Sequence, residues 1–498
     1  TNDKIYKEEH GMKKFLATLL ALTMLIGMVG MIPASAEEVV TLKWVTVGSG
    51  MPSNYAAWAE KLNAYLAEKI GVNIEMEVIS WGDWDNRRNV IVNTNEPYDL
   101  IFGNNGTYNS DVKLGAYLEI TEDMLKENAP GLLDLIPAGY WDACRVNGKL
   151  YAVPTYKDSS MTNYFVWDKD LLDANGMDVT DLHTLESLHD TLVALKDKTS
   201  NAVYPLNSNG AAYLLSRYDG FSSGLPVLGV RYDDAEMKVV ASVEQEDVLA
   251  DLATLHAWYT EGLINADAAT YPESNKYNVC SVAQGWPYAA ISTWGPNMGV
   301  NAIAVQYGDT IISNDTVQGS LNSISVNCEH PEKALALLNL INTDSYVRDS
   351  FYYGLEGDDW EYTADHRVHR NKTEWTMAGY TQATFFAVTQ LDDTDYNQWD
   401  EVKELNANAK ASVLLGFSFD STKVQDQISS CVEIYNRYKG EIMTGTVDPT
   451  DETRGVPAMM KEMRAAGFDE IVTEAQAQID AWKRSEERRV GKECRSRW

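Results

Sequence analysis

Two tryptophans stand where the sequence predicts turns of the chain beside the ends of strands. Trp81 follows an apolar run at residues 72–79, and Trp294 comes directly before Gly295 and Pro296. An indole ring in such a place can stack on the apolar C–H face of a sugar ring, while Asp, Asn and Glu side chains bind the sugar hydroxyl groups. The chain has 14 Trp and 27 Tyr, more rings than a core needs. We therefore expect Trp81 and Trp294 to line a ligand pocket.

A serine motif offers a second kind of chemistry. Gly220, Ser222 and Gly224 have the G-x-S-x-G spacing of a hydrolase nucleophile elbow, which needs a strand before the serine and a helix directly after it. Pro226 and a β-rich run at residues 225–230 follow instead, which favours a Gly/Ser loop. Carboxylate pairs for glycoside hydrolysis carry no information here, because chance pairs are common among 73 acidic residues.

An acidic stretch has part of a calcium-loop pattern. Asp393, Asp395, Asn397 and Glu404 match oxygen-ligand positions of the template, but Gln398 stands where the sharp turn requires glycine. A predicted helix begins at once, so a solvated acidic helix cap fits better than a calcium site. Seven His in the whole chain form no His-rich loop, which disfavours a transition metal. We expect no metal and no cofactor.

Trp81 lies in a part of the chain where predicted strands and helices alternate. The expected order is strand 39–47, helix 54–70, strand 72–79, a helix from 83 and strand 98–102. This β-α-β-α-β order implies right-handed crossovers and a mostly parallel sheet. Ligands bind such open sheets beyond the carboxyl ends of the strands. Those ends include Trp81 and Asn104, so we expect both side chains on one wall of the site.

The two ends of the chain differ from the rest. Met12 begins a basic segment, residues 15–29 are apolar, and an A-x-A cleavage site at residues 34–36 completes a signal peptide at 12–36. Residues 1–11 then look like upstream read-through, and the basic residues 484–498 look like a vector or assembly scar. No Cys between Met12 and Glu37 is available for lipidation. We expect a soluble extracytoplasmic protein, secreted or periplasmic.

The charge of the chain excludes two classes of partner. The formal net charge is −32; residues 1–36 contribute +1 and residues 484–498 contribute +3, so residues 37–483 carry −36. Such a field repels phosphate backbones and anionic lipid, which excludes nucleic acid and membrane-surface partners. The remaining length of about 450 residues predicts two or three domains.

Six short motifs occur in order along residues 40–482. They are PYDLIF at 97–102, GKLYAVP at 148–154, WDKDLL at 167–172, WGPN at 294–297, HPEKA at 330–334, and YGLEG at 353–357 with GFSFD at 416–420. Together they resemble the maltose-type extracellular solute-binding proteins (family 1) of bacterial ABC importers, in a Gram-positive-type subgroup with its own C-terminal domain. Two features depart from that family: the helix start at residues 183–188 is reduced, and the lipid-anchor Cys is absent.

The resemblance implies an α/β fold with two lobes, of the periplasmic-binding-protein-like type II, and a ligand cleft between the lobes. The expected divisions are 37–155 for the first part of lobe 1, 156–298 for the first part of lobe 2, 299–345 for the return to lobe 1, and 346–483 for the C-terminal part of lobe 2. The first crossing between lobes is expected at residues 154–158.

The implied function is that of the substrate-binding component of an ABC transporter. Such a protein captures a carbohydrate by hinge closure and delivers it to permease subunits, as a monomer and without enzymatic activity. An acidic sugar would require cations in the cleft, and Arg87, Arg88 and Lys157 are the candidates by position. The alternative is a secreted polysaccharide-degrading hydrolase or lyase, which needs a carboxylate pair in the cleft.

The resemblance also places further site residues. Tyr156 and Asp158 are expected at the cleft floor, with Trp294 facing them from the second lobe. Glu356 is expected after the chain has returned to the second lobe, where it adds a hydrogen-bond acceptor at the rim. The alternative for Tyr156 and Asp158 is that they only satisfy the backbone of the hinge, since many buried polar groups are structural.

Overall fold

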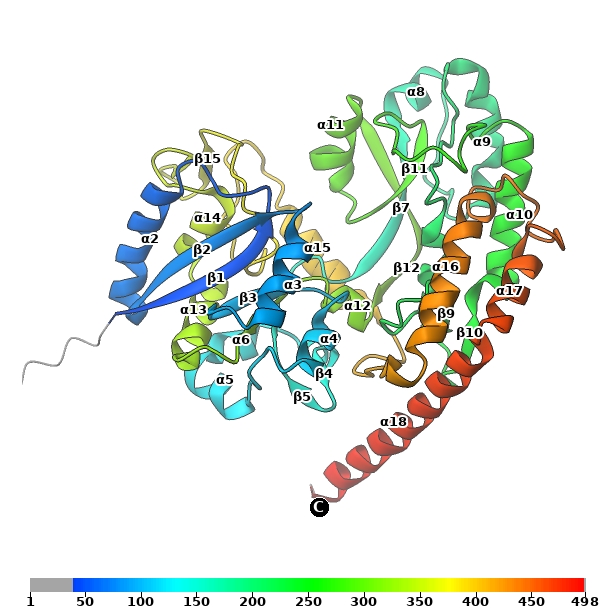
Figure 1. Ribbon diagram of the computed structural model, residues 1–498. Coiled ribbons are helices and arrows are strands. Elements are labelled where there is room, and N and C mark those ends of the chain that lie inside the picture. The colour runs from blue at the N-terminus through cyan, green and yellow to red at the C-terminus, as the bar shows by residue number, and fades with distance from the viewer. Residues whose placement is uncertain (1–38, 497–498) are drawn as a thin grey trace, which may run out of the picture.

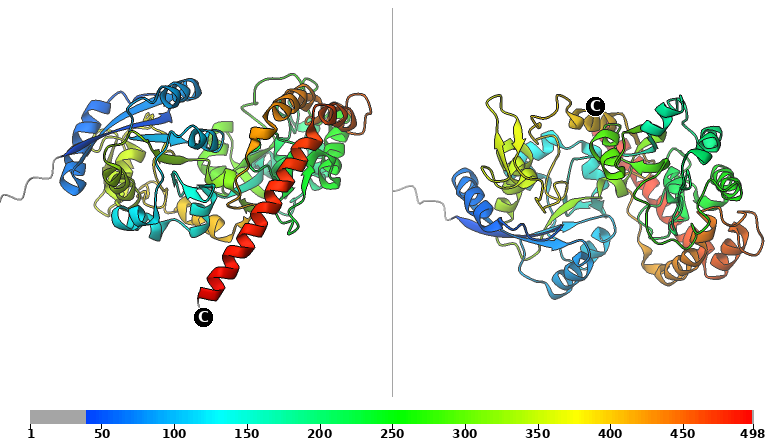
Figure 2. Two further views of the ribbon diagram at one scale, coloured as in Figure 1. Left: turned by 60° about the horizontal axis from the view of Figure 1, so that its bottom comes forward. Right: turned by 90° about the horizontal axis from the view of Figure 1, so that it is seen from above.

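The computed structural model describes the backbone of residues 39–496 and the side chains of residues 39–485, which form two α/β lobes. Figures 1 and 2 show the lobes side by side from three directions, which confirms the predicted two-lobed architecture. The predicted read-through at 1–11 and signal peptide at 12–36 lie outside the described residues. The predicted scar at 484–498 coincides with the end of helix α18 (Phe468–Ser496).

The sheet of the first lobe begins with three parallel strands. β1 (Val40–Gly48) lies between β2 (Val72–Ser80) and β3 (Leu100–Gly103), and β13 (Leu321–Ile324) pairs antiparallel with β3 and with β6 (Val153–Pro154). Helices α2 (Tyr55–Ile70) and α3 (Trp84–Thr94) connect the parallel strands. This confirms the predicted alternation and puts the carboxyl ends of β1, β2 and β3 at one edge of the sheet.

Packing explains why β2 adopts its register. Val72, Ile74, Met76 and Val78 are buried in alternation along the strand, as its period-two pattern predicts. The last residue pair between β1 and β2 is Gly48 with Ser80, so Trp81 is the first residue beyond the sheet edge. This placement fixes the position of Trp81.

The second lobe is built on a mostly antiparallel sheet. β7 (Met161–Asp168) lies between β11 (Cys280–Gln284) and β12 (Ala302–Ile312), and β16 (Lys410–Ala411) extends the sheet beside β12. One large core joins this sheet to the long helices that Figure 1 shows on this lobe, α10 (Glu246–Thr260), α16 (Gln425–Ile442), α17 (Val456–Ala465) and α18. The C-terminal part of the chain thus belongs to the second lobe.

Three segments connect the lobes. The first runs from β6 to β7 through residues 155–160, the second from β12 to α12 (Asn314–Val317), and the third follows α15 (Gln398–Asn408) and leads into β16. The first crossing, expected at residues 154–158, runs through residues 155–160. The return to lobe 1 falls at residues 312–313 rather than 298–299, because β12 pairs with β7 in the second lobe.

The last crossing also differs from the expected division at residues 345–346. α14 (Ser345–Tyr353) packs in the first-lobe core, where Phe351 lies 5.2 Å from Trp58 and 5.7 Å from Trp44 between ring centroids. Residues 345–408, here called the cap segment, stay with the first lobe around a small aromatic cluster. A bridge between Gly48 and Met377 places this segment at the carboxyl ends of the strands.

Candidate ligand site

An aromatic pair stands at the carboxyl edge of the first-lobe sheet. Trp81, directly after β2, is 50% exposed. One face of its indole lies against the ring of Tyr380 from the cap segment, with centroids 6.1 Å apart and planes at 16°. We call Trp81 and Tyr380 the platform. A half-exposed indole backed by a second ring presents a flat apolar surface to solvent, which suits the C–H face of a sugar.

The first crossing segment adds charged groups to the platform. The Lys157 ammonium lies 5.4 Å from the Tyr380 ring centroid and 2.9 Å from the Asp158 carboxylate. Burial and the nearby charge of Asp158 raise the pKa of Tyr380, so its phenol stays protonated. Asp158 is partly exposed and offers hydrogen-bond acceptors beside the rings. The structure thus brings Trp81 and Asp158 together through two residues, Tyr380 and Lys157.

Two other predicted residues lie near this edge in more ordinary roles. Asn104 follows β3 at the same edge as Trp81 and is partly exposed, while its Oδ1 accepts a hydrogen bond from the backbone N–H of Gly106. Tyr156 is only 6% exposed, because its ring packs edge-on between Tyr140 and Phe386. Its ring belongs to the first-lobe core, so ring stacking on a ligand stays a prediction for Tyr156.

The remaining two predicted residues lie apart from the platform. Trp294 ends a one-turn π-helix (Ala290–Trp294) of the second lobe, and its ring packs against Tyr164 at 5.9 Å. Glu356 lies in the cap segment of the first lobe rather than in the second lobe, and its carboxylate is 2.7 Å from the Lys61 ammonium of α2. Neither contacts Trp81 or Tyr380 in the described part of the chain.

Helix α15 joins the cap segment to the second lobe, a contact that the sequence did not predict. At its start, the Trp286 indole N–H donates to Gln398 Oε1 at 3.2 Å and the Tyr288 backbone N–H donates to Glu401 at 2.9 Å. At its end, Asn406 donates to the Lys157 carbonyl and accepts from the Ser160 N–H. The sequence offered one indication of this contact, namely the many aromatic residues at 286–294 and 396–399.

Arginines near the platform are already paired. Arg87 binds the carboxylates of Glu77 and Glu96, which raises its pKa, and the nearly buried Arg88 is paired with Asp111. These guanidinium groups hold first-lobe elements together. Of the three cations predicted for an acidic sugar, Lys157 lies against the platform, and its charge is matched by Asp158.

The acidic stretch at residues 393–404 forms a helix cap. Asn397 Oδ1 accepts from the Trp399 N–H at the start of α15, and Arg367 approaches Asp395 at 3.3 Å and donates to the Thr394 carbonyl. Within the described residues, no group of three or more His, Cys, Asp and Glu side chains is placed to hold a metal ion. In the same residues, no helix is long and apolar enough to span a bilayer.

The G-x-S-x-G motif forms a loop between strands. It follows β8 (Tyr218–Asp219), and β9 (Leu228–Arg231) comes after it, so no helix follows Ser222. Ser222 donates to Asp315 of α12, while Asp219 accepts from the Phe221 N–H and from the Ser412 hydroxyl. Through Ser222 the loop connects the second lobe to α12, at the end of the second crossing, and the hydrolase interpretation has no support.

Asp219 predicts a pH effect on stability. Burial, with the nearby charge of Asp315, raises its pKa to about 6 from 3.8. A group whose pKa is raised by folding contributes stability below about pH 4 and loses it as the pH rises through about 6. Relative to wild type, the free energy of unfolding of Asp219→Asn should rise by about 2 kcal/mol between pH 4.5 and pH 7.5. Urea unfolding at both pH values measures this; an equal difference at both would contradict it.

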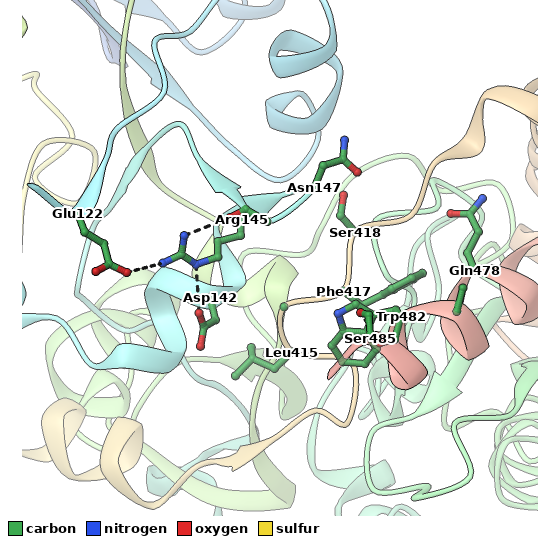
Figure 3. A pocket seen from close by; sticks show the side chains of 13 residues that line it. Glu122, Asp142, Arg145, Asn147, Leu415, Phe417, Ser418, Gln478, Trp482 and Ser485 are labelled. Carbon is green, nitrogen blue, oxygen red and sulfur yellow. Dashed lines mark hydrogen bonds and ion pairs between the residues drawn. The ribbon is translucent and has the colours of Figure 1, made fainter. Parts of the chain in front are cut away.

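A cavity of about 710 Å³ lies elsewhere between the lobes (Figure 3). Its first-lobe wall carries Arg145, 3.2 Å from Asp142 and 3.9 Å from Glu122, and its second-lobe wall carries Trp482, which packs edge-on against Phe417. None of the predicted site residues lines this cavity. We take the platform and the first crossing as the candidate site, because they stand beyond the carboxyl ends of first-lobe strands, where ligands bind open sheets.

Comparison with protein families gives two matches. The model described as bacterial extracellular solute-binding protein matches residues 48–347. A domain of unknown function (DUF3502) matches residues 413–484, the part of the second lobe that follows the third crossing. The two matches include parts of both lobes and leave residues 348–412, most of the cap segment, unmatched.

The chain is also similar to individual proteins. A carbohydrate ABC transporter substrate-binding protein of Streptococcus pneumoniae serotype 4 is 27% identical over 475 residues, covering 90% of this chain and 92% of that relative. The crystal structure of the N-glycan transport solute-binding protein NgtS from Streptococcus pneumoniae has a TM-score of 0.81 at 25% identity, covering 90% of this chain and 99% of that chain. NgtS in complex with Man5GlcNAc has a TM-score of 0.68 at 25% identity, covering 89% and 99%.

Proposed function

Because the chain belongs to the family of bacterial extracellular solute-binding proteins, we propose that it captures an oligosaccharide between its lobes for an ABC importer. The family match agrees with the six ordered motifs of the sequence, and the DUF3502 match agrees with the predicted C-terminal domain. The similar proteins are named as binding components of transporters, and no observation favours the polysaccharide-degrading alternative. In this proposal the protein binds its sugar and releases it chemically unchanged.

One observation carries the choice of a carbohydrate. Trp81 offers an indole face that is half exposed, supported from behind by Tyr380, and flanked by the Lys157–Asp158 pair. A sugar ring stacked on that face would have its hydroxyl groups beside the carboxylate. The known complex of NgtS with Man5GlcNAc supports an oligosaccharide of mannose and N-acetylglucosamine as the substrate.

Hinge closure is the proposed mechanism. Three short segments join the lobes, and Asn406 of α15 connects the third segment to the first by hydrogen bonds with the backbone groups of Lys157 and Ser160. The chain resembles the NgtS structure without a named ligand (TM-score 0.81) more than the Man5GlcNAc complex (0.68), as an open form would. A ligand that touches both lobes only when they are shut shifts the equilibrium toward the closed form. We still expect Trp294 to be the residue that the second lobe contributes to the ligand site in the closed form.

The cellular setting follows the same proposal. The protein acts outside the cytoplasm after cleavage near Ala36, as a monomer, and presents its loaded form to permease subunits. The strongly acidic chain supports the absence of a nucleic-acid partner, since like charges repel.

Calorimetry with a panel of oligosaccharides tests the proposal. We expect Man5GlcNAc or a related manno-oligosaccharide to bind with micromolar or tighter affinity and without release of product. Malto-oligosaccharides and alginate oligomers serve as neutral and acidic comparisons. Failure of every sugar to bind, or sustained cleavage of a polysaccharide, would contradict it.

A further inference from the structure

The segment that carries Tyr380 has no regular secondary structure, yet it lies in the interior. Residues 378–386 contain turns and bends, and Thr381, Ala383 and Thr384 are fully buried. Because the segment is neither helix nor strand, no regular series of backbone hydrogen bonds satisfies its carbonyl groups. Each buried carbonyl must therefore find a donor elsewhere, at a substantial cost if it does not.

Three framework side chains supply the donors. Arg348 on α14 donates through Nη2 to the carbonyl of Gly379 and through Nε to that of Thr384, both at 2.5 Å. Ser320 donates to the Tyr380 carbonyl at 2.9 Å, and Asn322 of β13 donates to residues 381 and 382 at 3.0 and 3.1 Å. The carbonyl groups of residues 379–382 and of Thr384 are thus all held from outside the segment.

The donors themselves are buried. Arg348 and Ser320 are 0% exposed and Asn322 is 2% exposed. The Arg348 guanidinium also lies 5.2 Å from the Tyr352 ring centroid, and burial lowers its pKa to about 10, so it remains charged at neutral pH. Charged donors make the stronger hydrogen bonds to carbonyl oxygens. We call Ser320, Asn322 and Arg348 the cradle.

We propose that the cradle positions the ligand site, by fixing Tyr380 as the support of Trp81 before any ligand arrives. The inference rests on the proposed function, because it assigns the three residues a role in binding although none of them contacts the solvent face of the platform. A platform ordered in advance avoids the entropic cost of ordering two aromatic side chains during binding. The cradle also reaches the hinge, since the Ser320 hydroxyl lies 3.0 Å from that of Thr155 in the first crossing.

A double-mutant cycle tests whether the cradle acts through Tyr380. Ser320→Ala removes the donor to the Tyr380 carbonyl, and we expect the Kd for Man5GlcNAc to rise about fivefold, as for one hydrogen bond. In a Tyr380→Ala background, where no ring remains to position, Ser320→Ala should change the Kd by less than about twofold. Equal fold-changes in both backgrounds would overturn the proposal, because they would show an effect independent of Tyr380.

Ser323→Ala is the matched control. Ser323 lies in the same strand as Asn322 and is equally buried, but its hydroxyl has no hydrogen-bond partner within the described residues. We expect this variant to bind like wild type. A loss equal to that of Ser320→Ala would assign the effect to any buried substitution in residues 320–324 and overturn the role of the cradle.

A ligand-free measurement separates this inference from the proposed function. In protein labelled with 5-fluorotryptophan, the ¹⁹F resonance of Trp81 is assigned by its disappearance in Trp81→Phe. Ser320→Ala should shift or broaden this resonance, and Ser323→Ala should leave it unchanged. If Man5GlcNAc does not bind the wild type, the proposed substrate is wrong, while an unchanged resonance in Ser320→Ala overturns the cradle itself.

Discussion

Replacing Trp81 with alanine is expected to weaken oligosaccharide binding by roughly 30-fold to 700-fold, or about 2–4 kcal/mol. The indole is the most exposed ring of the platform and has Tyr380 behind it, so its loss removes the stacking surface. Its exposure also means that few core contacts are lost, and the free energy of unfolding should change by less than about 1 kcal/mol. Calorimetric titration and urea unfolding of the same preparation measure the two effects.

Two further variants define the source of that loss. Trp81→Phe keeps a flat ring and should lose less affinity than Trp81→Ala. Trp482→Ala removes a partly exposed indole that packs on Phe417 beside the cavity of Figure 3. It should lower stability and leave the affinity unchanged. Wild-type affinity in Trp81→Ala would show that the site lies elsewhere.

Gly379→Ala is expected to lower the free energy of unfolding by about 2–3 kcal/mol, within the usual range for overpacking. A methyl group at this position would lie 2.5 Å from the Tyr352 ring. That ring cannot yield easily, because Tyr353, Phe385 and Trp399 pack edge-on around it. Urea unfolding measures the loss, and the displaced backbone should also weaken sugar binding.

Gly82→Ala provides the matched control for the glycine. An added methyl group at Gly82 meets no atom within 4 Å, and this residue adjoins Trp81. We expect its stability to stay within about 0.5 kcal/mol of wild type. A loss in Gly82→Ala as large as that in Gly379→Ala would contradict the steric explanation.

The positions of Trp81 and Asn104 beyond the ends of regular strands were predictable from the sequence. The alternation of apolar residues in β2 places Ser80 at the sheet edge and Trp81 beyond it, and β3 does the same for Asn104. The first crossing was predictable from the resemblance of residues 148–154 to the family motif. Local patterns were sufficient there, because a period of two residues determines which side chains are buried.

Tyr380 and the cradle were not predictable in this way. The segment around Tyr380 has no periodicity, and it is held by side chains 30 to 60 positions earlier in the chain. The sequence offered one indication of this packing, which is the glycine directly before Tyr380. Only glycine fits at position 379, because an added methyl group would collide with Tyr352. For Trp294, the sequence predicted a loop, whereas a π-helix turns its ring toward Tyr164.

The lobe boundaries after residue 298 were not predictable for a related reason. β12 joins the second-lobe sheet by antiparallel pairing with β7, and no local pattern in residues 302–312 states which sheet will accept the strand. The cap segment stays with the first lobe because Phe351 packs between Trp44 and Trp58, which are distant in sequence. Glu356 was therefore predicted in the wrong lobe.

Small-angle scattering during a titration with Man5GlcNAc measures whether an oligosaccharide bound at the platform closes the two lobes. We expect the radius of gyration of wild type to fall on saturation, and that of Trp81→Ala to stay at the ligand-free value at the same sugar concentration. Wild type that binds the sugar with an unchanged scattering profile would contradict capture by hinge closure.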